Sequence, residues 1–96
     1  MIKRLNPILH SELRLAIISY LVANGTSDFS EVKEITKATS GNISIQLKKL
    51  EKEKYIIINK GFFNNYQHTS IEITNTGIDA FEEYVKAIKQ YVKYFF

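Results

Sequence analysis

One segment, residues 40–54, constrains the fold most, because its apolar and polar side chains separate onto two faces at helical spacing. Ile43, Leu47 and Leu50 lie at positions i, i+4 and i+7 and therefore share one stripe. At about 100° per residue, the opposite face carries Gly41, Ile45, Lys48 and Lys52, flanked by Asn42, Ser44 and Lys49. The sequence thus predicts a short amphipathic helix that packs isoleucine and leucine inward and presents small polar and basic groups outward.

Positive charge is concentrated around this helix. The chain has a formal net charge of only +3, but residues 37–60 contain six lysines and two glutamates. A local excess of this kind is the electrostatic footprint expected of a nucleic-acid binder. The alternative is an ordinary solvated helix face with Lys/Glu pairs, and charge alone leaves both interpretations open.

Composition excludes several other classes of protein. The 96 residues fit one small domain, 1–96, with 45% apolar residues and no run long enough for a membrane span or a signal peptide. Without cysteine, neither a disulfide framework nor a thiolate metal site can form. The only histidines, His10 and His68, have no partner at ligand spacing, and no phosphate loop, nucleophile elbow or carboxylate pair is present. We expect a cytoplasmic protein with no metal, no cofactor and no enzymatic activity.

The order of elements along the chain predicts the fold. Helical patterns occupy about 10–23, 29–36 and 40–54, strand patterns occupy 55–58 and 69–73, and Thr74 is a good cap for a last helix. Two short helices joined by a tight turn, the second amphipathic and basic, are typical of a helix-turn-helix. The fold class is therefore α+β, mainly α: a winged helix-turn-helix. Its parts are the helix-turn-helix at about 28–54, a hairpin wing at about 55–73 and a C-terminal helix at about 74–96.

The C-terminal helix carries a heptad-like stripe. Apolar residues from Ile78 to Phe95 are spaced 3, 4, 3, 4 and 3 apart, which is an a/d pattern over more than two heptads. We expect the part up to about Phe81 to pack on its own domain and the rest to pair with a second copy, joined by Leu5, Ile8 and Leu9. The predicted dimerisation residues are Phe81, Tyr84, Val85, Ile88, Tyr91, Val92 and Phe95.

Four motifs in this order resemble the short single-domain winged-helix regulators near the MarR and ArsR families. They are residues 10–17 (HSELRLAI), Asp28-Phe29, residues 41–51 (GNISIQLKKLE) and residues 73–77 (ITNTG). The resemblance implies a homodimeric transcriptional regulator, by default a repressor, bound to double-stranded DNA at a pseudo-palindromic operator. The resemblance also implies which residues contact bases and phosphates: Ser40, Asn42, Ser44, Ile45, Gln46, Lys48 and Lys49. Gln46 stands where the family commonly has histidine, and its amide could pair with adenine in a bidentate manner.

The wing departs from the family pattern. Its outer part, residues 62–70, contains no charged side chain, although the family's wings usually end in arginine or lysine. The wing residues that could bond DNA are Lys60, Asn64, Asn65, Gln67 and His68. Such a wing predicts a shallow salt dependence of DNA binding.

Alternatively, the aromatic wing and the C-terminal helix form a protein–protein interaction module, anchored by Phe62, Phe63 and Tyr66. A small apolar effector between the C-terminal helices and the DNA-binding part is a further possibility that no residue identifies.

Overall fold

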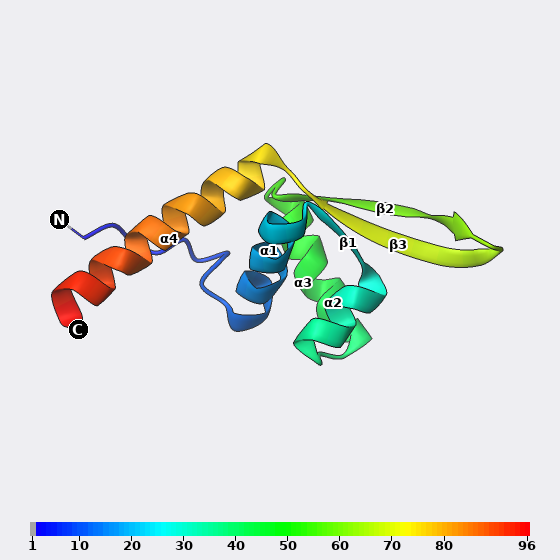
Figure 1. Cartoon of the computed structure of the whole chain (residues 1–96), viewed down its shortest axis with the longest axis horizontal. Helices are drawn as coiled ribbons and strands as arrows, with labels where there is room; N and C mark the ends of the chain where they lie inside the picture. Colours follow the sequence, from blue (N-terminus) through cyan, green and yellow to red (C-terminus); the bar gives the residue numbers. More distant parts are fainter. Residues whose placement is uncertain (1) are drawn as a thin grey trace.

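The computed structural model describes residues 2–96 and contains four helices and three strands (Figure 1). The elements are α1 (Glu12–Asn24), β1 (Thr26–Asp28), α2 (Phe29–Thr36), α3 (Ser40–Lys52), β2 (Ile56–Phe63), β3 (Tyr66–Ile73) and α4 (Asn75–Phe95). The predicted winged-helix order is confirmed, with one strand added between the first two helices. The helix predicted over residues 40–54 ends two residues earlier, at Lys52.

Local chemistry fixes the turn between α2 and α3. The Asp28 carboxylate caps α2 by accepting a hydrogen bond of 2.7 Å from the Glu31 amide. α2 ends at Thr36, and the next residue, Lys37, turns the chain with a φ of 58° in the left-handed region. The Thr39 hydroxyl then caps α3 by accepting from the Asn42 amide at 3.2 Å. These caps stop one helix and start the next within a few residues, which is what a helix-turn-helix requires.

The strand β1 is the element that the sequence did not predict. It pairs antiparallel with β3, so that the sheet order is β1-β3-β2. Ser27 lies opposite Ile71 and is buried, and the Thr26 hydroxyl donates to the Ile71 carbonyl at 3.0 Å. Three residues of polar sequence are too short to show the alternation by which strands are recognised.

The wing occupies the predicted residues, but its strands are longer and its turn is tighter than predicted. β2 and β3 pair from Ile56–Ile73 out to Phe63–Tyr66, leaving only Asn64 and Asn65 in the turn. Both asparagines have positive φ, 51° and 67°, as the central residues of a type I′ hairpin turn require. The outer part of the wing, residues 62–70, therefore belongs mostly to paired strands, and alternate side chains along it point to opposite faces of the sheet.

The core lies between α1, the helix-turn-helix and the base of the sheet. Its fully buried side chains are Leu9, Ile17, Ile18, Leu21, Val32, Ile43, Leu50, Ile56 and Ile71. The predicted inner stripe of α3 is confirmed, since Ile43, Leu47 and Leu50 are all buried. This packing fixes the rotation of α3 about its axis, and so determines which of its side chains face solvent.

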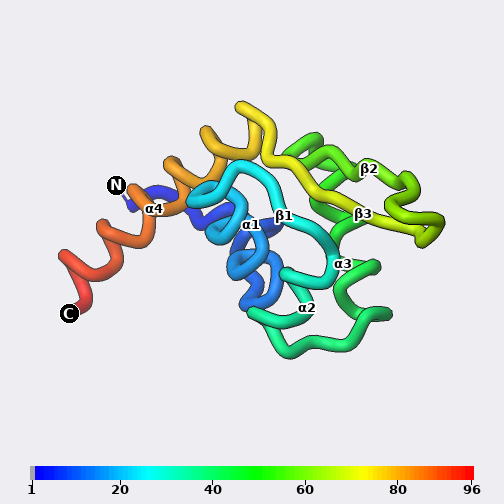
Figure 2. Tube along the Cα trace, turned by 45° about the vertical axis from the view of Figure 1, so that its right-hand side comes forward, coloured from blue at the N-terminus to red at the C-terminus, as the bar shows by residue number. Residues whose placement is uncertain are grey.

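The N-terminal segment corrects the prediction for α4. It runs beside α4 (Figures 1 and 2), with Lys3 bonded to Glu83 and Gln90. Tyr84 is only 6% exposed, and its hydroxyl lies 3.0 Å from His10 Nδ1. Leu9 is fully buried in the same chain. Packing of α4 within its own chain therefore extends past Phe81, and Tyr84 and Leu9 are core residues rather than the dimer contacts predicted.

The molecule is elongated, with principal dimensions of 53 × 25 × 21 Å. In both views the wing projects to one side of the body and the C-terminal half of α4 to the other (Figures 1 and 2). Within residues 2–96, no helix combines the length and the apolar character needed to cross a bilayer.

Candidate nucleic-acid interface

The outward face of α3 is the centre of the candidate interface. Because the helix is anchored by its buried stripe, six of the seven predicted α3 residues are exposed: Ser40, Asn42, Ser44, Ile45, Lys48 and Lys49. Ile45 is 55% exposed, which is unusual for an isoleucine but suits contact with a thymine methyl group. The face thus offers hydroxyls, an amide, an aliphatic group and two ammonium groups on one surface.

Gln46 is the exception on this helix. It is half-buried, its Oε1 accepts a hydrogen bond of 2.6 Å from Arg14 Nη1, and its Nε2 donates to Asn42 Oδ1 at 2.9 Å. Both ends of its amide are therefore engaged within the protein. Each end keeps one further hydrogen-bonding position, so the bidentate adenine contact suggested by the sequence stays a prediction, and it would compete with these two bonds for the orientation of the amide.

Arg14 is the interface residue that the sequence analysis missed. It lies on α1, 32 positions away from Gln46, and it appeared in the sequence only as part of a motif. Its Nε also donates to the Ile8 carbonyl at 2.6 Å. No local pattern could reveal this contact, because it depends on how α1 packs across α3.

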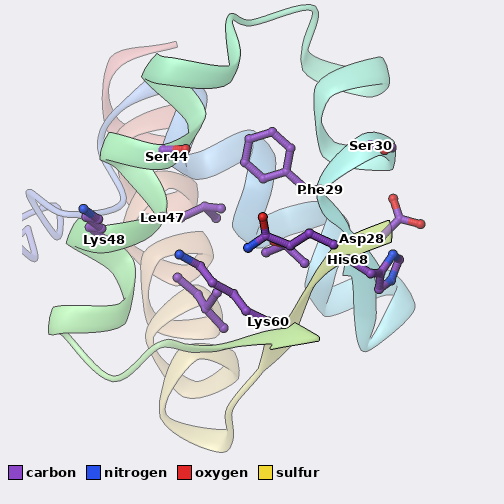
Figure 3. Close-up of a pocket in the computed structure, with 11 residues that line it drawn as sticks. Asp28, Phe29, Ser30, Ser44, Leu47, Lys48, Lys60 and His68 are labelled. Atoms are coloured by element: carbon purple, nitrogen blue, oxygen red, sulfur yellow. The ribbon is translucent and has the colours of Figure 1, made fainter. Parts of the chain in front are cut away.

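A hollow of about 380 Å³ separates the helix-turn-helix from the wing (Figure 3). Ser44 and Lys48 line it from α3, Phe29 lines it from α2, and Lys60 extends into it from the wing toward α3 (Figure 3). Neither Lys48 nor Lys60 is ion-paired in residues 2–96. Two free ammonium groups on facing walls suit a phosphate backbone that passes between α3 and the wing.

The register of the hairpin divides the predicted wing residues between two faces. Lys60 pairs with Thr69 and Phe62 pairs with Gln67, so these four side chains share one face of the hairpin. This face borders the hollow beside α3, which Lys60, Gln67 and Thr69 line. The other face carries Phe63, Tyr66 and His68, and the Phe63 and His68 rings lie 6.4 Å apart. Asn64 and Asn65 form the tip. The structure thus brings Lys60 and Gln67 together beside α3, while His68 lies at the edge of the hollow near Asp28 (Figure 3).

The predicted dimerisation residues fall into three groups along α4. Tyr84 is buried, as described above. Phe81, Val85, Ile88 and Tyr91 are half-buried, and Val92 and Phe95 are 55% and 63% exposed. The Tyr91 and Phe95 rings lie 5.9 Å apart, forming an aromatic pair on the last two turns. The stripe therefore becomes progressively more open toward the C-terminus.

Comparison with known proteins agrees with this architecture. Residues 13–92 match the family described as winged helix DNA-binding domain. An uncharacterized protein of Methanocaldococcus jannaschii is 34% identical over 86 residues, covering 90% of this chain and 94% of that protein.

Solved structures share the fold. The transcriptional regulator homologue from Pyrococcus horikoshii superposes with a TM-score of 0.82 at 23% identity, over 90% of this chain and 85% of that one. MarR superposes with a TM-score of 0.75 at 15% identity, over 90% of this chain and 62% of that one. With its buried α3 stripe, its paired wing and a family match over most of its length, the chain belongs to the winged helix DNA-binding domain family.

Proposed function

We propose that this protein is a sequence-specific DNA-binding transcriptional regulator. The observation that carries the proposal is the exposed face of α3, where Asn42, Ser44 and Ile45 lie beside Lys48 and Lys49. Amide, hydroxyl and aliphatic groups can distinguish base pairs in the major groove, and the lysines can bind the flanking phosphates. The hollow between Lys48 and Lys60 gives the backbone of the DNA a path between α3 and the wing.

The proposal includes a homodimer formed through α4. Val92, Tyr94 and Phe95 are exposed on the helix end that projects from the body, and such an aromatic surface is an aggregation liability unless a partner covers it. A two-fold dimer would present two recognition helices about 34 Å apart, one turn of DNA, and would favour a pseudo-palindromic operator. Repression follows if that operator overlaps a promoter.

An effector is not needed for this proposal. NadR, a neighbour in fold with a TM-score of 0.72, has been solved in complex with 4-hydroxyphenylacetate. In the present chain, the hollow between the N-terminal segment and α4 measures about 150 Å³, which is smaller than the roughly 300–1,000 Å³ of typical ligand pockets. An effector at this place would therefore need walls supplied by a second subunit.

The direct test is fluorescence anisotropy with the DNA upstream of the protein's own gene and a shuffled duplex of equal length, at two salt concentrations. A specific regulator should prefer its own DNA by a factor of about a thousand or more. Equal and weak binding to both duplexes, lost at physiological salt, would contradict the proposal and leave the lysines as a solvated face.

The lysines provide a second test. The Lys48→Ala/Lys49→Ala variant should weaken binding to both duplexes and lower the salt slope by about two, because each phosphate contact contributes about 0.9 to that slope. The matched control is Lys89→Ala/Lys93→Ala, which removes the same charge from exposed positions of α4. If both variants lost affinity equally, net charge rather than the α3 face would be responsible.

A second candidate function is a protein–protein interaction module. Phe62, Phe63 and Tyr66 are 81%, 68% and 79% exposed on the uncharged outer part of the wing, and such aromatics are common anchors of interfaces. If the wing serves a protein partner, Phe62→Ser should abolish capture of that partner and leave DNA binding unchanged, whereas Asn59→Ser at the root of the wing should change neither. Loss of DNA affinity on Phe62→Ser would instead place the wing on DNA.

A further inference from the structure

We propose that Arg14 is a positioning residue that determines which base Asn42 can read, acting through Gln46. The inference rests on the proposed DNA-binding function and names the base specificity of that same site. It follows from a chain of three hydrogen bonds that joins α1 to the exposed face of α3: Arg14 to Ile8, Arg14 to Gln46, and Gln46 to Asn42.

Arg14 is held firmly before it reaches α3. Its Nε donates to the Ile8 carbonyl at 2.6 Å, and the Ile8 amide in turn donates to Asn6 Oδ1 at 2.8 Å. Asn6 Nδ2 donates to the Tyr55 hydroxyl at 3.0 Å, just before the wing begins. Arg14 forms no ion pair in the described chain. Its guanidinium is therefore fixed by neutral oxygen atoms, and Gln46 supplies one of them.

Because Arg14 can only donate hydrogen bonds, it sets the orientation of the side-chain amides of Gln46 and Asn42. A guanidinium has hydrogen-bond donors only, so Gln46 must turn its Oε1 toward Arg14, as the 2.6 Å contact shows. The Gln46 NH₂ group must then point along α3 and needs an acceptor, which Asn42 provides with Oδ1 at 2.9 Å. This leaves the Asn42 NH₂ group as the free end of the chain, on an exposed residue.

The consequence is a preference among bases. With one lone pair of Oδ1 bonded to Gln46, Asn42 has two N–H donors and one remaining acceptor position, so donors predominate. Guanine presents two acceptors, N7 and O6, in the major groove, whereas cytosine presents the N4 donor. We therefore expect the base that Asn42 faces to carry acceptors, with guanine matching best and cytosine worst.

Gln46→Glu is the sharpest test, because it keeps the shape of the side chain and replaces the NH₂ donor with an acceptor. The introduced carboxylate would accept from Arg14 and could also accept from Asn42 Nδ2, so that Asn42 Oδ1 would face the DNA. Affinities would be measured for duplexes carrying each of the four base pairs at each operator position. We expect the variant to lose affinity for every duplex through its added charge, and at one position to shift its preference toward a base with a donor, cytosine or adenine, by about tenfold. An unchanged order of preference at every position would overturn the inference.

Arg14 variants test whether Arg14 orients the hydrogen bonds that run through Gln46 to Asn42. Arg14→Met should reduce discrimination at that same position by about tenfold, while the salt slope and the affinity for shuffled DNA stay near those of wild type. Arg14→Lys keeps a donor-only cation and should restore much of the discrimination. An equal loss of affinity for all duplexes in Arg14→Met, without rescue by lysine, would show that Arg14 supports only the fold or the charge.

One measurement needs no DNA and separates this inference from the proposed function. In the free protein, the side-chain amide protons of Gln46, one of which is bonded to Asn42, should exchange with solvent more slowly in wild type than in Arg14→Met, as measured by NMR. Equal exchange rates would overturn the inference even if the protein is a DNA-binding regulator. Slow exchange together with no preference for any duplex would instead contradict the proposed function and, with it, the reading of a base by Asn42.

Discussion

Gly77 is a residue at which α4 packs closely against the rest of the chain. A Cβ atom at this position would collide with the Tyr55 carbonyl oxygen and would lie 2.8 Å from Ile73 Cδ1. The same Tyr55 carbonyl accepts hydrogen bonds from the amide and hydroxyl of Thr74, which caps α4, so it is not free to move aside. We expect Gly77→Ala to lower the free energy of unfolding by about 1–3 kcal/mol, as for other overpacked sites, measured by urea denaturation.

Gly41 is the matched control. It lies in α3 with no atom within 4 Å of an added Cβ, so Gly41→Ala should raise stability by about 0.5–1 kcal/mol through helix propensity. If both variants were equally destabilised, the close approach at Gly77 would not be the cause. The same Gly41 variant, if it lost DNA affinity, would show that α3 approaches the DNA closely at this turn.

Gln46 marks the limit of prediction from the sequence at the residue scale. Its position on α3 follows from periodicity, and so does the exposure of its neighbours Ile45 and Lys48. Its orientation does not, because it is set by Arg14, a partner 32 residues earlier in the chain. Helical spacing predicts which side of a helix a residue occupies, but it contains no information about hydrogen bonds between elements.

At the scale of elements, the four helices and the inner part of the wing were predictable, whereas β1 and the outer half of the wing were not. The a/d spacing of α4 indicated an apolar stripe, but the extent to which its own chain covers that stripe depends on the N-terminal segment. β1 and the outer half of the wing lack apolar alternation, and they form because β3 offers both of its edges for pairing. These features depend on hydrogen bonds between strands, which polar side chains do not signal.

The attachment of the N-terminal segment to α4 should depend on pH. Hydrogen bonds from Lys3 and Lys86 and the charges of these lysines hold the pKa of Glu83 below its ordinary value. A carboxyl group whose pKa is lowered in the folded state stabilises that state above its ordinary pKa of about 4.3. The contribution is then lost as the pH falls through the lowered pKa. The effect is small because the pair is exposed.

The Lys3 amide offers a direct probe, since it donates to Gln90 Oε1 at 2.8 Å. Its NMR chemical shift should move toward that of a free segment as the pH falls in wild type. At neutral pH the shift should already be displaced toward the free value in Glu83→Gln. Glu82→Gln, a neighbouring change that removes no ion pair among residues 2–96, should behave as wild type. A wild-type shift that does not respond to pH would show that the Lys3–Glu83 contact does not hold the segment in place.

At the scale of the whole molecule, the proposed dimer predicts a change in mass. Val92→Glu/Phe95→Glu places two charges on the exposed end of α4 and should convert a dimer into a monomer in analytical ultracentrifugation, because burying unpaired carboxylates is costly. The monomer should bind a single half-site but lose most of its affinity for the full operator. Lys89→Glu/Lys93→Glu, which lies on the same helix away from the apolar stripe, should remain dimeric. A wild-type protein that is already monomeric at micromolar concentration would contradict this part of the proposal.

The arrangement of the chain ends has a practical consequence. The segment that begins at residue 2 and the last turn of α4 lie at the same end of the molecule, across the body from the wing (Figure 1). A fluorophore or a fused protein at either end would therefore be held away from the α3 face and would be less prone to obstruct an approaching duplex. The same geometry makes the two ends a natural pair for energy-transfer labels: separation of the N-terminal segment from α4 would be read directly as a loss of transfer, without a probe on the DNA-binding surface.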